Sequence, residues 1–389
     1  MSASRPPVSL TPLDGQSESL PEALDKFIAR MPKVEIHLHL EGSVLPHTLR
    51  DLARKYDVDI PVHDDASLAA FYQFRDFAHF VDVYMASCFC LRAPEDFARI
   101  AYEVGAEAAR QNTRYLEIHF NPEPNQRKRK IPFRDQLDGM NEGRARALAE
   151  FGVEMRWIAD GVRDAEIGPG SVTQTVEWIS GLPESDGVIA LGLGGFEADG
   201  PPELFVAEFE AARSAGLHVV AHAGESTGPD FIWTSLRDLG AERIGHGVAA
   251  IKDPALVEHL AATQVPLEVC PVSNLRTRVV ERDDAHPFAA LDAAGVLVTV
   301  NSDDPPMFGT TLNDEYRFLT RAFGYDAAGL ARLSRNGVTA SFLPESRKAD
   351  LLAAFDAECA SLGAELGLPI AAELQREGAP HKPPLTPMR

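Results

Sequence analysis

Short runs of apolar residues alternate along the chain with longer segments in which apolar side chains recur at helical spacing. The runs are rich in Val, Ile and Leu, which is typical of strands that are buried on both faces. Helical segments such as Pro94 to Gln111 and Pro202 to Ala215 follow most of the runs. The predicted strands comprise residues 34–40, 114–120, 153–160, 188–193, 217–222, 243–246, 266–270 and 296–301.

This alternation predicts an α/β fold in which eight parallel strands, each followed by a helix, close into a (β/α)₈ TIM barrel. An open, doubly wound sheet is the alternative. That fold usually has a glycine-rich phosphate loop after its first strand. Here the first strand ends in His37-Leu38-His39 instead, so the barrel is the preferred prediction.

Length and composition fit one catalytic domain. A chain of 389 residues with 45% hydrophobic content can bury one large core. We place this domain at residues 21–377 and expect residues 1–20 and 378–389, which are rich in Pro, to be disordered tails. A formal charge of −21 would repel nucleic acid, so a small-molecule partner is expected and no nucleic acid.

The four cysteines indicate the compartment. They are too few for a disulfide scaffold and do not form the C-x-x-C pattern of a structural zinc site, so we expect reduced thiols. No segment approaches the roughly 20 apolar residues that cross a bilayer, and the N-terminus lacks the apolar core of a signal peptide. These observations predict a cytoplasmic protein with no membrane partner; the oligomeric state stays open.

A pair of histidines indicates metal chemistry. Side chains two residues apart on a strand point the same way, so His37 and His39 can share one ion. His222 ends the fifth predicted strand, and the pair Asp303-Asp304, which can supply a carboxylate, follows the eighth. Three imidazoles and a carboxylate form a nitrogen and oxygen set that suits zinc. We therefore expect a mononuclear zinc site and hydrolytic chemistry.

Further candidate residues follow the same strands. Gly195 comes just after the fourth strand, Glu225 after the fifth, His246 at the end of the sixth, and Asp304 next to Asp303. Barrel enzymes place their active sites at the carboxyl ends of the strands. The shared edge therefore predicts one active site.

Five ordered segments carry a family resemblance: residues 32–42 (PKVEIHLHLEG), 222–225 (HAGE), 243–247 (RIGHG), 271–274 (PVSN) and 301–305 (NSDDP). In this order they resemble the motifs of the adenosine deaminase branch of the zinc amidohydrolase superfamily, over nearly the whole chain. The resemblance implies one zinc ion per subunit, with His37, His39, His222 and Asp303 as its ligands. It implies Glu225 as proton donor, His246 and Asp304 as partners of the attacking water, and His39, Glu41, Gly195 and Asp304 as substrate-binding residues.

Physical chemistry supports these roles. Zinc lowers the pKa of a bound water from about 15.7 to about 7, which makes a nucleophile available at neutral pH. His246 could take the proton of the water or orient the oxygen, and Asp304 could hydrogen-bond it. Glu225 must be protonated to donate to a purine nitrogen, which requires a dry pocket that raises its pKa.

The resemblance implies a 6-aminopurine substrate more firmly than its sugar. Adenosine-specific members usually have Asp where this chain has Glu41, and residues 191–197 lack the Asp of that group. The same residues lack the serines seen in relatives that deaminate free adenine. Adenosine, or a 5′-modified adenosine with a carboxylate such as 6-aminodeoxyfutalosine, is the expected substrate, with adenine as the alternative.

Other functions fit less well. A zinc hydrolase of another cyclic amide usually has a bridging lysine on strand four, where this chain has glycines. An inactive binding protein would have lost a ligand or Glu225, and all are present. The pattern of cytidine-type deaminases is absent.

Two other patterns have a functional and a structural interpretation. Phe71, Phe74, Phe77 and Phe80 could form an apolar lid or could belong to ordinary helix packing. The basic run at residues 127–130 reads as a solvated loop, with attraction of an anionic substrate as the alternative.

Overall fold

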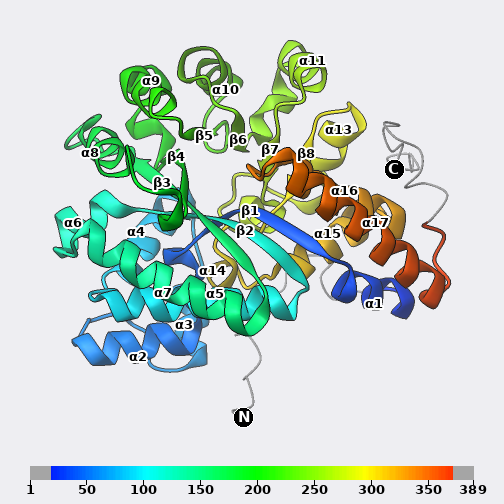
Figure 1. Cartoon of the computed structure of the whole chain (residues 1–389), viewed down its shortest axis with the longest axis horizontal. Helices are drawn as coiled ribbons and strands as arrows, with labels where there is room; N and C mark the ends of the chain where they lie inside the picture. Colours follow the sequence, from blue (N-terminus) through cyan, green and yellow to red (C-terminus); the bar gives the residue numbers. More distant parts are fainter. Residues whose placement is uncertain (1–18, 371–389) are drawn as a thin grey trace.

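The eight predicted strands form one parallel sheet in which each strand lies beside the next in the chain (Figure 1). This computed structural model describes residues 19–370. Side chains of Ile, Leu and Val fill the strands and are almost entirely buried, as a sheet that is covered on both faces requires. The strands are β1 Lys33–His39, β2 Thr113–Phe120, β3 Glu154–Val162, β4 Val188–Gly194, β5 His218–Ala223, β6 Arg243–His246, β7 Leu267–Val269 and β8 Val298–Val300.

The sheet closes where the chain beyond β8 meets β1. An isolated parallel bridge joins Leu38 to Asp303. The amide of His39 donates to the Asp303 carbonyl at 2.9 Å, and the Asp303 amide donates to the His37 carbonyl at 3.2 Å. The predicted (β/α)₈ barrel is therefore confirmed, and its closure places Asp303 directly beside the histidines of β1.

Helices surround the barrel (Figure 1). They are α1 Glu22–Arg30, α2 Pro46–Tyr56, α3 Asp65–Phe71, α4 Phe77–Cys88, α5 Pro94–Arg110, α6 Pro122–Arg129, α7 Phe133–Phe151, α8 Gly170–Ile179, α9 Val206–Ser214, α10 Pro229–Thr234, α11 Pro254–Thr263, α12 Pro271–Arg276, α13 Phe288–Ala293, α14 Pro305–Phe308, α15 Leu312–Phe323, α16 Ala327–Ala340 and α17 Glu345–Leu366. The shorter helical turns are η1 Glu41–Ser43, η2 Glu184–Asp186, η3 Glu197–Asp199, η4 Pro202–Phe205, η5 Ser235–Leu239, η6 Val248–Lys252 and η7 Asp283–Ala285.

Two predicted segments differ from the structure. The helix expected over Pro202 to Ala215 is divided into η4 and α9, with the break at Phe205. The basic run at residues 127–130 was expected to be a loop, but Arg127 to Arg129 form the last turn of α6 and Lys130 adopts a left-handed conformation after it. The first turn of α6 contains two prolines, whose fixed φ suits a helix start.

The phenylalanines after β1 do not form one helical stripe. Phe71 ends α3, whereas Phe77 and Phe80 belong to α4. Phe77 stacks on Phe196 at 5.6 Å between ring centroids, and Phe80 lies 5.1 Å from Phe308 in the same measure. Phe196 follows β4 and Phe308 ends α14, so α4 connects loops from two sides of the barrel mouth.

The predicted domain at residues 21–377 extends beyond the described residues at its C-terminal end, and the tail at residues 378–389 lies wholly outside them. The same holds for the N-terminal tail except for its last two residues. Across residues 19–370, every helix is too short or too polar to cross a bilayer.

Candidate metal centre and active site

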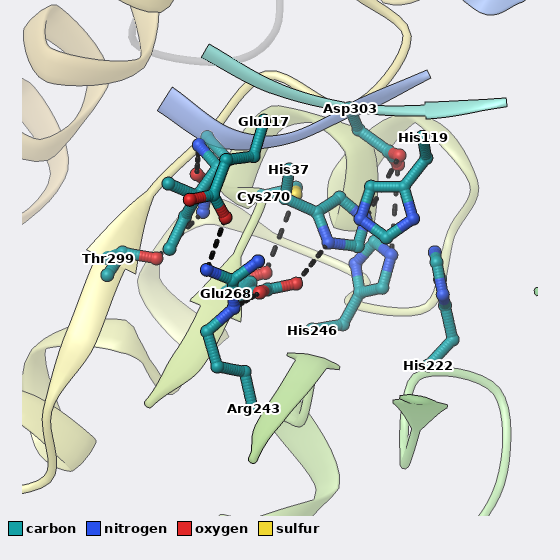
Figure 2. A network of polar contacts seen from close by, with 12 residues as sticks. His37, Glu117, His119, His222, Arg243, His246, Glu268, Cys270, Thr299 and Asp303 are labelled. Atoms are coloured by element: carbon teal, nitrogen blue, oxygen red, sulfur yellow. Dashed lines mark hydrogen bonds and ion pairs between the residues drawn. The ribbon is translucent and has the colours of Figure 1, made fainter. Parts of the chain in front are cut away.

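Four side chains converge at the carboxyl ends of two strands, β1 and β5, and in the segment after a third strand, β8. The Nε2 atoms of His39 and His222 lie 3.3 Å apart. Asp303 Oδ1 lies 3.3 Å from His39 Nε2 and 3.6 Å from His37 Nε2. Ligands about 2.05 Å from a tetrahedral zinc ion are separated by about 3.3 Å, which matches these distances. Figure 2 shows His37, His222 and Asp303 turned toward one another.

In all three histidines, Nδ1, the other ring nitrogen, faces an oxygen. His37 Nδ1 lies 2.7 Å from Glu268 Oε2, and His222 Nδ1 lies 3.1 Å from the carbonyl oxygen of Leu193. His39 Nδ1 lies 3.7 Å from Asp160 Oδ2. Acceptors at Nδ1 keep a proton there, which leaves the Nε2 lone pair available for a cation.

An unsatisfied atom also supports metal coordination at this site. His37 is fully buried, and its Nε2 has no hydrogen-bond partner among the described residues. A buried polar atom without a partner is costly, and metal coordination would satisfy it. The donor set of three imidazoles and one carboxylate therefore fits a metal ion.

Two carboxylates keep their negative charge: Glu268, which contacts His37, and Asp303, which is one of the four candidate ligands. Burial alone would raise the pKa of Glu268, but the Arg243 guanidinium and the bond to His37 bring it down to about 2. Burial likewise opposes ionisation of Asp303, yet the neighbouring His37 and His39 imidazoles hold its pKa well below its usual range. Ser273 also donates to Asp303 Oδ2 at 2.7 Å. The site therefore offers fixed negative charge to a cation.

The backbone is strained at His246 and at Asp303. His246 has a φ of 59° and Asp303 a φ of 64°, a left-handed conformation that costs a non-glycine residue about 1 to 3 kcal/mol. The hydrogen bonds between Asp303 and β1 hold the strained residue in place. Such strain is concentrated at functional sites, and here it directs both side chains into the barrel mouth.

Glu225 lies in a dry position beside the candidate metal site. It is 7% exposed, and its Oε2 lies 3.8 Å from His246 Nε2. Burial raises its pKa well above the usual range, and the negative charges of Asp303 and Glu197 raise it further. This shift favours the protonated carboxyl group, which a proton donor requires.

A second glutamate holds the segment that carries Glu225. Glu197 Oε2 accepts hydrogen bonds from the amides of Ser226 and Thr227, each at 2.8 Å, and from both of their hydroxyl groups. Its Oε1 accepts from the Glu225 amide at 3.4 Å. Glu197 lies in η3, which follows β4. Its hydrogen bonds therefore join the loop after β4 to the loop after β5.

The other predicted residues lie around this centre. Asp304 is buried beside Asp303, and burial together with the Asp303 charge raises its pKa well above the usual range. Its Oδ1 is buried without a hydrogen-bond partner. Glu41 Oε1 accepts from the Asn121 amide at 3.0 Å and from Asn125 Nδ2 at 2.9 Å, while Oε2 is buried and unpartnered. Both carboxyl groups therefore retain an atom for a ligand.

Gly195 is required by its own backbone conformation. Its φ is +86°, and an added Cβ would lie 3.0 Å from the Arg163 carbonyl oxygen. Arg163 is buried and donates to the carbonyl oxygens of His222 at 2.8 Å and Gly200 at 2.9 Å. The glycine thus lets the loop after β4 pack against the end of β3. This packing explains the residue type independently of any purine contact.

Sequence reasoning missed a buried pair beside His39. His119 is the penultimate residue of β2, and its Nδ1 lies 2.8 Å from Asp160 Oδ1 on β3. An added Cβ at Gly192 would lie 1.8 Å from the same oxygen, so the glycines of β4 leave room for Asp160. The available signal was a polar side chain near the end of an apolar strand. Glu268, within the apolar run of β7, gave a similar signal.

Comparison with known proteins agrees with this geometry. A family model described as adenosine deaminase matches residues 32–358. An aminodeoxyfutalosine deaminase of Streptomyces avermitilis is 44% identical over 335 residues, which cover 86% of this chain and 92% of that protein. An adenine deaminase of Cupriavidus necator is 37% identical over 334 residues, which cover 86% and 94%.

A solved structure supplies the same fold. The crystal structure of an amidohydrolase from Burkholderia ambifaria with bound Zn has a TM-score of 0.84 and 28% sequence identity, and it covers 93% of this chain and 100% of that one. The family model and the aligned relatives both span most of the chain. The chain therefore belongs to the adenosine deaminase family and is an aminohydrolase enzyme of that family.

Proposed function

We propose that this enzyme uses one zinc ion per subunit to remove the 6-amino group of an adenosine-type purine nucleoside by hydrolysis. The observation that carries the proposal is the convergence of three imidazole Nε2 atoms and Asp303 Oδ1 beside the buried Glu225, whose pKa is raised by burial. Zinc is supported by the donor set and by the Zn-bound amidohydrolase with the same fold. When bound, zinc supplies a water of lowered pKa as the nucleophile.

The residues of this chain then handle the purine. Glu225 donates its proton to a ring nitrogen next to the amino-bearing carbon, which makes that carbon more electrophilic. Asp304 offers an unpartnered oxygen beside the ligands, where it can hydrogen-bond the attacking oxygen. Gly195 is the proposed backbone contact to the purine, since it follows β4 at the same rim. Addition of water and loss of ammonia complete the reaction.

For the sugar end of the substrate, we propose a 5′-modified adenosine with a carboxylate, such as 6-aminodeoxyfutalosine. The relative with 44% identity bears the name of an aminodeoxyfutalosine deaminase. Glu41 is the proposed sugar contact, because its buried Oε2 has no partner within the described chain. The adenine deaminase relatives make free adenine the alternative.

A substrate panel tests this proposal. Zinc-loaded enzyme is offered 6-aminodeoxyfutalosine, adenosine, 2′-deoxyadenosine and adenine, and kcat/KM is measured from the change in purine absorbance. We expect the first compound to exceed adenosine by at least about tenfold, the effect of about 1.4 kcal/mol of added interaction. A higher kcat/KM for adenine than for all the nucleosides would contradict the proposed sugar contact.

Two cations of the basic run, Arg129 and Lys130, have no carboxylate partner among the described residues, and Lys130 Nζ donates to the Arg127 carbonyl oxygen at 2.8 Å. Arg127 bonds to Glu123 at 2.7 Å and to Asp164, and Lys128 lies 3.7 Å from Asp164. Arg129 forms no ion pair with any described residue, and its Nε and Nη1 are buried without hydrogen-bond partners. An uncompensated, partly buried cation suits an anionic ligand.

Arg129 also lies on the substrate side of α6. It is four residues from Asn125, which bonds Glu41, so both project from one helix face. The positive charge of Arg129 acts on Tyr84, and the negative charges of Glu41 and Asp304 act on the same hydroxyl, whose pKa burial raises well above the usual range. We therefore propose Arg129 as the partner of the substrate carboxylate.

Replacing Arg129 by Gln tests this assignment. A charge-assisted hydrogen bond contributes about 1.5 to 3 kcal/mol, so KM for 6-aminodeoxyfutalosine should rise about 10- to 100-fold. KM for adenosine, which has no carboxylate, should change less than about twofold. Lys128→Gln removes an equal charge from the same turn and serves as control. Equal effects of the two variants on both substrates would refute a specific contact.

A further inference from the structure

A chain of three hydrogen bonds lies behind His246. The backbone N–H of Phe288 donates to His286 Nδ1 at 3.1 Å. His286 Nε2 lies 3.2 Å from Asn274 Oδ1, and Asn274 Nδ2 lies 3.3 Å from His246 Nδ1. All three side chains are buried. We call these contacts the His286–Asn274 relay.

The backbone amide fixes the direction of every bond in the relay. A peptide N–H can only donate, so His286 Nδ1 carries a lone pair and His286 Nε2 carries the proton. That proton requires the Asn274 oxygen as its acceptor, which leaves the Asn274 amide nitrogen to donate to His246. His246 Nδ1 is therefore an acceptor, and the ring proton lies on Nε2.

A second proton on either ring is unfavourable. Each Nδ1 already accepts a hydrogen bond, which leaves no room for a proton there, and burial lowers the pKa of His286 to about 3. Both imidazoles are therefore neutral at physiological pH. The relay then selects one neutral tautomer of His246 over the other.

This tautomer is the opposite of the one at the candidate ligands. His37 and His222 each face an acceptor at Nδ1 and so expose a lone pair at Nε2. His246 faces a donor at Nδ1 and exposes an N–H at Nε2. That N–H points into the site, 3.8 Å from Glu225 Oε2 and 3.9 Å from Asp303 Oδ2. The hydrogen bonds at Nδ1 thus separate the histidines that can hold a cation from the one that donates.

We infer that the His286–Asn274 relay makes His246 a hydrogen-bond donor that holds the attacking oxygen, and that His246 does not take the proton of the nucleophile. Asn274 and His286 are positioning residues, since they act only through His246. The catalytic part of this inference rests on the proposed function. The tautomer itself does not, because it is a property of the protein without substrate.

Nitrogen NMR of the whole enzyme tests the tautomer directly. Protein labelled with ¹⁵N-histidine is compared with a His246→Gln variant, whose missing signals assign His246. We expect Nδ1 of His246 to be a pyridine-type nitrogen and Nε2 a protonated, pyrrole-type nitrogen near neutral pH. The reverse pattern, or a doubly protonated ring, would overturn the inference whatever the substrate is.

An Asn274→Asp variant then tests the consequence for catalysis. A carboxylate accepts from both neighbours, so it should move the His246 proton to Nδ1 and reverse the NMR pattern. Loss of one oriented donor costs about 100-fold, so we expect kcat with adenosine to fall by about that factor while KM changes less than about threefold. A reversed tautomer with full kcat would refute the donor role.

Two further variants separate the relay from general damage. Asn336→Asp is the control for Asn274→Asp, because it makes the same change of amide to carboxylate outside the relay. The Asn336 amide donates to the carbonyl oxygen of Val298, and the variant should keep kcat within about twofold. His286→Leu frees the Asn274 amide to rotate, so both His246 signals should show mixed character and kcat should fall about tenfold. Should Asn274→Asp fail to fold, this variant decides the catalytic role: an unchanged kcat with mixed tautomers refutes it.

Discussion

A Glu225→Gln enzyme is expected to keep its metal and to lose most of its turnover. The amide has the shape of the carboxyl group but has no acidic proton to give to a purine nitrogen. General acid catalysis by a positioned side chain contributes about 10²- to 10⁴-fold, so kcat should fall by about 10³-fold. Measurement of kcat together with the metal content of the purified variant checks both parts of the expectation.

The pH profile provides a second readout of Glu225. Its pKa is raised, first by burial and then by the charges of Asp303 and Glu197, and the active form is the protonated one. Activity should therefore be complete below this pKa and should fall as the pH rises through it. The residual rate of Glu225→Gln should lack that fall.

Glu242→Gln is a matched control for this substitution. Glu242 precedes β6 and bonds His218 at 2.9 Å, on the opposite end of β5 from Glu225. It should retain kcat within about twofold. Should Glu225→Gln turn over as fast as this control, Glu225 would not be the proton donor.

The barrel could be predicted from sequence because its strands are buried on both faces. Such strands appear as continuous apolar runs, and the eight runs were found with only small errors in their ends. The turn that carries Arg127 to Arg129 was predicted wrongly because it shows no apolar periodicity. Its helix is held by tertiary contacts of its buried side, such as those of Asn125 with Glu41 and Gln136.

The candidate ligands were predictable for a related reason. Each is a polar residue at the end of an apolar run, and barrel closure brings such ends together. The residues behind them were not predictable. Glu268 is 231 positions from His37 in the chain, and His286 reaches Asn274 only through the packing of the segment before α13. Nothing in the local sequence specifies either contact, although these contacts determine the tautomer of each histidine.

Removal of the metal is expected to abolish activity. Dialysis against a chelator should reduce turnover to background, and zinc should restore it.

Glu268 offers a graded test of how the site holds the metal. In Glu268→Gln, His37 Nδ1 loses its charged partner at 2.7 Å. Loss of a carboxylate that hydrogen-bonds a metal-binding histidine weakens metal binding about 10- to 100-fold. Competition with a coloured chelator measures this loss without any substrate.

Glu117→Gln isolates the effect on His37 from the effect on the buried arginine behind it. Glu117 and Glu268 each contact Arg243 at 2.5 Å, but only Glu268 also contacts His37. Both variants therefore weaken the Arg243 contacts and should lower stability in similar ways. Only Glu268→Gln should weaken zinc binding, because only it changes the orientation and basicity of a ligand. Equal zinc affinity in the two variants would mean that Glu268 stabilises the barrel and does not tune the metal site.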